Sequence, residues 1–139
     1  MTEDAMSKLV DYQYCAGVLP YTDFNNSVYF LMGKSRKHGR LVTFSGKNDS
    51  LDESIANTAA REFFEETLGA VMDKSSALNA IKKTTIVLKS QTPRNLPCYT
   101  FLIEIPFRKV YSVAFHKTRE FLNEINVRAF EFHEMIDIK

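Results

Sequence analysis

Three glutamates in the middle of the chain have the spacing of ligands on one side of a helix. Glu62, Glu65 and Glu66 stand at positions i, i+3 and i+4, so a helix would bring their carboxylates together. Like charges at this spacing repel, and a hard divalent cation, which prefers oxygen ligands, would relieve the repulsion. Arg61 could orient or charge-balance one carboxylate, and Glu53 could reach the same ion from the helix start. If only the charges of these glutamates are considered, a solvated acidic face of the helix is the favoured interpretation.

The glutamates end a longer pattern of glycine and charged residues. It consists of Gly46-Lys-Asn-Asp-Ser-Leu-Asp-Glu53, seven further residues and Arg61-Glu62-Phe63-Phe64-Glu65-Glu66. This order resembles the box of the Nudix hydrolase family and is much more specific than a lone glycine motif. Six residues rather than five separate Gly46 from Glu53, and Leu68 delays Gly69 by one position. Neither departure touches the helical carboxylates.

The resemblance implies a fold, a cofactor and a reaction. The fold would be an α/β/α sandwich with a mixed β-sheet, as one Nudix hydrolase domain over residues 1–139. Mg²⁺ or Mn²⁺ would be held by Glu65 and Glu66, with Glu62 as a further ligand or the base and Arg61 as its orienting partner. Glu53 would complete the catalytic set by supporting metal binding or water activation. Water would attack a phosphorus of a nucleoside diphosphate derivative or a related small phosphorylated compound, cleaving the diphosphate linkage. The family often adds a carboxylate from its last strand, where the candidates here are Glu131 and Glu134.

Basic residues near the box are candidates for binding phosphate oxygens. Lys47 lies inside the motif loop, beside the predicted metal. Lys34, Arg36, Lys37 and Arg40 form the most basic loop of the chain. We predict substrate binding by Lys47, Arg40 and Lys34, although a solvated hairpin loop explains the loop's charges equally well.

Other residue types suggest less specific roles. Aromatic residues in the predicted strands could stack on a base but are more typical of a core, namely Phe44, Tyr99 and Phe101. The histidines have no ligand spacing and are interpreted as surface or satisfied residues, namely His38, His116 and His133. Cys15 and Cys98 form no CxxC motif and are interpreted as buried structural thiols of a reducing compartment.

Alternating strands and helices must position the box. Strands are predicted for residues 12–19, 28–32, 41–44, 84–88, 98–105 and 128–135, with Pro20 ending the first. Helices are predicted for residues 52–68, 75–83 and 116–126 from the spacing of their apolar residues. Strands interrupted by helices are typical of a mixed sheet with helical layers.

Composition narrows the choice of function. The chain has 139 residues, which suits one domain, and a formal net charge of +1, which directs it toward neither nucleic acid nor membrane. No apolar stretch approaches the roughly 18 residues of a membrane span, and the acidic N-terminus lacks the order of a signal peptide. We therefore predict a cytoplasmic enzyme with a small diphosphate substrate and no membrane partner.

Two other functions use the same residues. A hydrolase of capped or 5′-triphosphorylated RNA would need a basic track along the RNA, which the near-neutral charge disfavours. A catalytically idle module that binds a nucleotide or a protein should have lost members of the carboxylate set, and none is lost here. Activity on a small diphosphate is the favoured interpretation.

Overall fold

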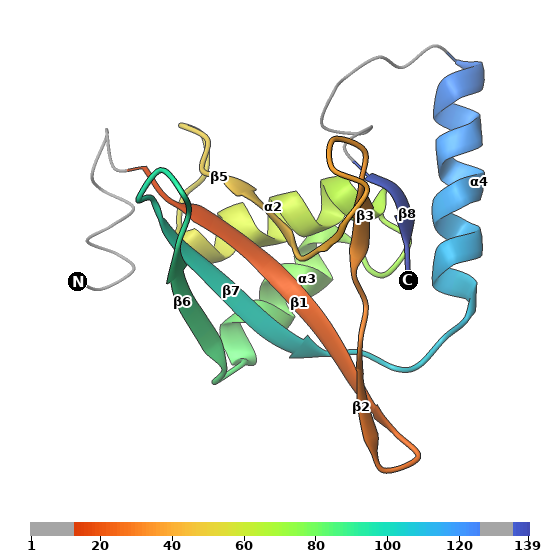
Figure 1. Ribbon diagram of the computed structural model, residues 1–139, viewed down its shortest axis with the longest axis horizontal. Coiled ribbons are helices and arrows are strands. Elements are labelled where there is room, and N and C mark those ends of the chain that lie inside the picture. The colour runs from red at the N-terminus through yellow and green to blue at the C-terminus, as the bar shows by residue number, and fades with distance from the viewer. Residues whose placement is uncertain (1–12, 126–134) are drawn as a thin grey trace.

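The computed structural model describes residues 13–125 and 135–139 (Figure 1). Its strands and helices, in chain order, are β1 (Cys15–Phe24), β2 (Ser27–Phe30), β3 (Gly33–Ser35), β4 (Leu41–Val42), β5 (Phe44–Lys47), α2 (Ile55–Thr67), α3 (Lys74–Lys83), β6 (Val87–Gln91), β7 (Pro97–Glu104), α4 (Val110–Glu124) and β8 (Met135–Ile138).

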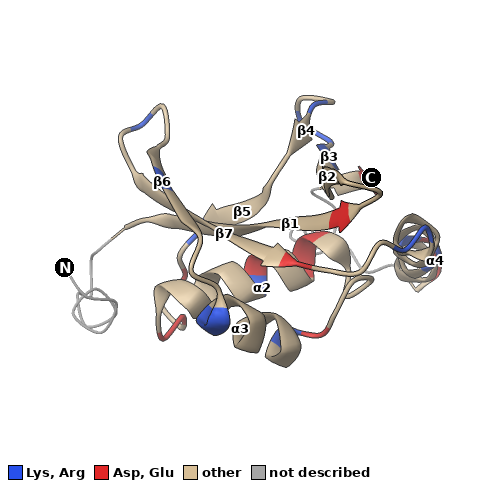
Figure 2. Cartoon of the chain, turned by 90° about the horizontal axis from the view of Figure 1, so that it is seen from below, with Lys and Arg blue, Asp and Glu red and all other residues tan. Residues whose placement is uncertain are grey.

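Two sheets organise these elements. The larger has the order β2-β1-β7-β6, with β5 also paired to β1, and the smaller has the order β4-β3-β8. β1 runs parallel to β7 and antiparallel to β2 and β5, so the larger sheet is mixed. Figure 2 shows α2 and α3 together on one face of this sheet and α4 at its end. The predicted α/β architecture with a mixed sheet is confirmed.

The core lies between the larger sheet and α2. Ala16 and Val18 of β1 are fully buried, as are Ala59 and Phe63 of α2. The ring of Phe63 packs at 5.5 Å between centroids from that of Phe44 on β5, also buried. Truncating a buried phenylalanine costs about 3 to 5 kcal/mol, so this contact fixes the helix against the sheet. Phe44 therefore has the core role that aromatic residues in strands usually have.

β1 does not end at Pro20, as the sequence predicts, but continues to Phe24. The N–H and C=O groups of one strand residue point to the same side, and the Pro20 carbonyl accepts a hydrogen bond from Leu31 N at 3.0 Å. The N–H that proline lacks would therefore lie on the side away from β7. On that side the partner of β1 changes from β5 to β2, so the missing donor interrupts no continuous ladder.

Helix ends differ from the predictions where capping decides them. α2 begins after Ser54, whose hydroxyl accepts a hydrogen bond from Asn57 N at 3.1 Å, rather than at Asp52. At its other end Leu68 adopts a left-handed conformation, φ 54°, one residue before Gly69. The inserted leucine is thus part of the helix stop.

The remaining boundaries shift by a few residues. α4 begins at Val110, ahead of the predicted start at residue 116, because Tyr111 and Phe115 are buried one helical turn apart. β6 begins at Val87 rather than at residue 84. Most of the strand predicted for residues 128–135 lies outside the described residues, and β8 covers Met135–Ile138.

The two cysteines are neighbours rather than separate core thiols. Cys15 on β1 and Cys98 on β7 are direct partners in the parallel pairing, and both are half-buried. Burial raises the pKa of the Cys15 thiol, and the adjacent Cys98 thiol raises it further. Within the described residues, no helix is both long and apolar enough to cross a membrane.

Candidate active site

α2 places the box glutamates at the boundary between core and surface. Its apolar face is buried against the sheet, and Glu62 and Glu66 are themselves only 8% and 3% exposed. Glutamate is almost never buried to this degree unless its charge is compensated. The helix therefore holds two carboxylates in an environment that favours binding of positive charge.

Arg61 uses all five of its N–H donors within the site. Nε and Nη2 donate to the two oxygens of Asp52 at 2.9 Å each. Nη1 donates to Glu62 Oε1 at 2.9 Å and to Glu65 Oε2 at 3.3 Å. Nη2 also donates to the Lys47 carbonyl at 3.1 Å. One guanidinium thus joins β5, the loop before α2 and two box glutamates.

Asp52 is held by a network that reaches the core. The Thr58 hydroxyl donates to Asp52 Oδ2 at 2.9 Å, and the Asp49 N–H donates to the same oxygen at 2.8 Å. The hydroxyl of Tyr14 lies 2.8 Å from that of Thr58. Because Thr58 has one hydroxyl proton and gives it to the carboxylate, Tyr14 acts as the donor to Thr58.

These contacts set the charges of the pair. Burial by itself would raise the pKa of Asp52, but the hydrogen bonds from Arg61, Asp49 and Thr58 outweigh it and lower that pKa. The hydrogen bonds to Asp52 raise the pKa of Arg61 above its ordinary value. Both groups are therefore charged at neutral pH, and Arg61 is a fixed cation between acidic residues.

Gly46 shapes the position of Glu62. A Cβ atom added at Gly46 would overlap the carboxyl group of Glu62. β5 therefore crosses α2 so closely that only glycine leaves room for that carboxylate. The first residue of the box motif thus has a steric role in the site.

The acidic residue that contacts Arg61 from the loop before α2 is Asp52, whereas the role of Glu53 stays a prediction. Glu53 is exposed ahead of the N-cap Ser54, whereas Asp52 makes the paired contact with Arg61. A signal for this arrangement is present in the sequence. Five residues separate Gly46 from Asp52, the separation between glycine and acid in the Nudix box. Counted from Gly46, the family's spacing therefore places Asp52 where the box has its first glutamate.

A cavity of about 550 Å³ adjoins one of the box glutamates, Glu66. It is lined by Glu66 and Ser45 and, from the loop between β3 and β4, by Arg36, Lys37 and His38. The loop's cations thus share one cavity with a buried glutamate of α2. His38, expected to have no role in the site, lies in this lining as well.

The three predicted substrate-binding residues lie outside that lining. Lys34 lies in β3, where it is paired with Leu41 of β4, and Arg40 is exposed. Lys47 contacts the site through its backbone carbonyl, which accepts a hydrogen bond from Arg61. Glu131 and Glu134, the candidate ligands from the last strand, lie outside the described residues.

The donor chemistry of the site fits a hard divalent cation. Carboxylates of Glu62 and Glu65 already converge on one cationic nitrogen, Arg61 Nη1, and Glu66 is buried beside them on the next position of the helix. In residues 13–125 and 135–139, however, no three side chains of His, Cys, Asp or Glu are grouped as ligands of one ion. Binding of one ion by all three glutamates would therefore require their carboxylates to move closer together than they lie in this structure.

Comparison with known proteins gives limited similarity. No model of a known protein family matches the chain. Over 57 residues the chain is 40% identical to protein L534 of Acanthamoeba polyphaga mimivirus, an alignment that covers 37% of this chain and 18% of that protein. The chain therefore matches less than a fifth of that relative's length.

Two solved structures are similar at low identity. One is the Ap4A hydrolase of C. elegans, with a TM-score of 0.48, 16% identity and coverage of 66% of this chain and 67% of that one. The other is the NUDIX domain of Shewanella oneidensis NrtR complexed with ADP ribose, with a TM-score of 0.49, 16% identity and coverage of 91% and 70%.

Proposed function

We propose that the chain is a Nudix-type pyrophosphohydrolase that cleaves the diphosphate linkage of a nucleoside diphosphate derivative or a related small phosphorylated compound. The observation that carries the proposal is the shared cavity of Glu66 and the cations Arg36 and Lys37. A diphosphate needs cationic groups for its oxygens and a carboxylate-bound metal beside its phosphorus atoms. This cavity brings together the cations Arg36 and Lys37 and one carboxylate, Glu66, that could bind such a metal.

Glu62, Glu65 and Glu66 would hold Mg²⁺ or Mn²⁺, whose carboxylate preference they satisfy. The bound ion would neutralise the diphosphate and lower the pKa of a water. Arg61 positions Glu62 and Glu65 through its two Nη1 hydrogen bonds and is itself held by Asp52. Arg36 and Lys37 would bind the phosphate oxygens that face away from the helix.

The complete set of box charges supports activity over an idle binding role. Arg61, itself held by Asp52, binds Glu62 and Glu65. Holding these carboxylates together costs stability, and a cost of this kind is typical of a functional site. A module that only bound a partner would gain nothing from holding these carboxylates together against their mutual repulsion.

A turnover screen tests the proposal. Nucleoside diphosphate sugars, dinucleoside polyphosphates and nucleoside triphosphates are incubated with Mg²⁺ or Mn²⁺ in isotopically labelled water, and products are resolved by mass. We expect divalent-dependent cleavage of at least one substrate, with the label in one phosphate product. Glu66→Gln should reduce turnover at least a hundredfold, whereas Glu120→Gln, an exposed glutamate of α4, should leave it unchanged. Equal turnover in Glu66→Gln and the parent chain would refute the site.

Metal binding is measured separately from turnover. Millimolar Mg²⁺ should raise the melting temperature, because the folded chain holds the carboxylates together and the unfolded chain disperses them. The increase should be lost in Glu65→Gln/Glu66→Gln. A stabilised chain without turnover would support the idle-module function instead.

A further inference from the structure

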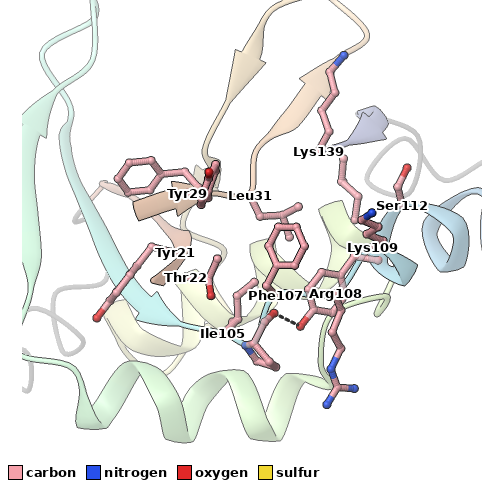
Figure 3. A pocket seen from close by; sticks show the side chains of 14 residues that line it. Tyr21, Thr22, Tyr29, Leu31, Ile105, Phe107, Arg108, Lys109, Ser112 and Lys139 are labelled. Carbon is pink, nitrogen blue, oxygen red and sulfur yellow. Dashed lines mark hydrogen bonds between the residues drawn. The ribbon is translucent and has the colours of Figure 1, made fainter. Parts of the chain in front are cut away.

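A second cavity, of about 390 Å³, lies at the other end of β8 from the carboxylate cavity. Met135, the first residue of β8, lines the carboxylate cavity, whereas Ile138, the last, lines the second. Among the residues that the structure describes, none lines both cavities. Figure 3 shows the second cavity between Tyr29 of β2 and the segment that carries Phe107 toward α4.

Aromatic side chains form its walls while remaining open to solvent. Tyr29, Phe30 and Phe107 are 49%, 47% and 45% exposed. The rings of Phe24 and Phe107 are stacked, with centroids 4.6 Å apart and planes 12° from parallel. Phe24 lines only a shallower pocket on its own side of Phe107, so the other face of Phe107 is presented to the cavity. Half-exposed aromatic residues around one cavity are typical of a ligand site.

The floor of the cavity is rigid. Ile105, Tyr111 and Ile138 are buried there, and Tyr111 donates its hydroxyl hydrogen bond to the Pro106 carbonyl at 2.9 Å. Ile105 N donates to the Tyr21 carbonyl at 2.8 Å, which continues the sheet to the cavity edge. The cavity therefore exists before any ligand binds, and binding would cost little ordering of the chain.

The charged side chains that line the cavity, among the residues that the structure describes, are all basic. Arg108 and Lys109 are both exposed and adjacent at the start of α4, and Lys139 lines the cavity as well. None of the lining residues that the structure describes is Asp or Glu. Asp23 and Glu104 line the shallower pocket beyond Phe107, and Asp137 accepts a hydrogen bond at 3.2 Å from the hydroxyl of Ser112, which lines the cavity. An anionic group would therefore meet basic side chains and, among the described lining residues, no carboxylate side chain.

We propose that this cavity binds a small planar aromatic ligand that carries a negative charge. Its ring would stack on the open face of Phe107 with Tyr29 at its edge, and its anionic group would contact Arg108 and Lys109. Stacking selects a flat ring, and the cations select an acidic substituent. This site is separate from the hydrolase site, because the box glutamates and the loop cations Arg36 and Lys37 take no part in it.

Calorimetric titration without divalent metal tests the proposal. Two aromatic anions, AMP and indole-3-carboxylate, distinguish a nucleotide from an aromatic acid, and adenosine and indole are their uncharged counterparts. Ribose 5-phosphate supplies the anion without the ring. We expect at least one aromatic anion to bind at least tenfold more tightly than both its uncharged counterpart and ribose 5-phosphate. Absence of binding by both aromatic anions at millimolar concentration would overturn the proposal.

Variants locate the bound ligand. Arg108→Gln/Lys109→Gln should weaken binding at least tenfold, whereas Lys82→Gln/Lys83→Gln, a matched pair of exposed charges on α3, should not. Arg36→Gln/Lys37→Gln separates this site from the carboxylate cavity and should leave binding unchanged. Phe107→Leu should weaken it with little loss of melting temperature, because the side chain is nearly half exposed. Loss of binding in Arg36→Gln/Lys37→Gln alone would assign the ligand to the hydrolase site and refute the second one.

Discussion

The carboxyl group of Glu62 lies against the Cα of Gly46, in space that any larger residue at position 46 would fill. The contact joins β5 to α2 at the point where Arg61 Nη1 also holds Glu62. Glycine is thus required by a close approach between a strand and a carboxylate, and its backbone conformation there is unremarkable because its φ is not positive.

Gly46→Ala should therefore displace the Glu62 carboxylate and lower the rate of diphosphate hydrolysis at least tenfold. Overpacking of this kind also costs about 1 to 3 kcal/mol of stability. Turnover is measured at a temperature where circular dichroism shows the variant folded. Ser50→Ala, in the exposed part of the same loop, is the control and should retain full activity. Full activity in Gly46→Ala would remove Glu62 from the proposed site.

Local sequence predicted the elements better than their partners. The helix over α2 follows from the spacing of Ile55, Ala59 and Phe63, which are all buried. The predicted end of the first strand at Pro20 was wrong, because the effect of the missing N–H depends on which neighbouring strand it faces. That neighbour is set by the change of partner from β5 to β2, a long-range feature that local sequence does not encode.

The sequence predicted which residues gather at the site but not which of them contact Arg61. The cluster of Arg61 with the helical glutamates follows from helix geometry, but the choice between Asp52 and Glu53 depends on where the helix is capped. The pairing of β3 with β8 shifts register between Lys34 and Ser35. A bulge redirects the side chains that follow it, and sequence patterns do not reveal it.

Asp52→Asn should lower the stability of the folded chain, whereas Glu53→Gln should not. The Asp52 side chain is buried and gives Arg61 two charge-assisted hydrogen bonds, whereas Glu53 is exposed. Weakening such a pair costs about 2 kcal/mol, which lowers the melting temperature of a chain of this size by about 6 °C. Thermal unfolding of both variants measures the difference. Equal losses in the two variants would show that Arg61 does not depend on Asp52.

Acid should remove the contribution of Asp52. Its pKa in the folded chain is lowered from the ordinary value of 3.8, so the folded state favours the ionised form. The stabilisation is therefore fully present above pH 3.8 and is lost as the pH falls through the lower, folded-state pKa. The difference in free energy of unfolding between the parent chain and Asp52→Asn should be constant near neutrality and shrink below pH 3.8. Urea unfolding across this range measures it, and a difference that grows in acid would contradict the ion pair.

The basic loop offers a test of which cations bind the substrate. Arg36 and Lys37 line the cavity of Glu66, whereas Lys34 of β3 and Arg40 at the end of the loop do not. Arg36→Gln/Lys37→Gln should raise the Michaelis constant for the diphosphate about tenfold, equivalent to about 1.4 kcal/mol, with a smaller change in kcat. Lys34→Gln/Arg40→Gln removes the same net charge from the loop and should change it less than threefold. Steady-state kinetics at physiological salt separates the two pairs, since screening suppresses the general effect of charge and leaves the direct contacts. Equal increases in both pairs would mean that the loop attracts the substrate only through its overall charge.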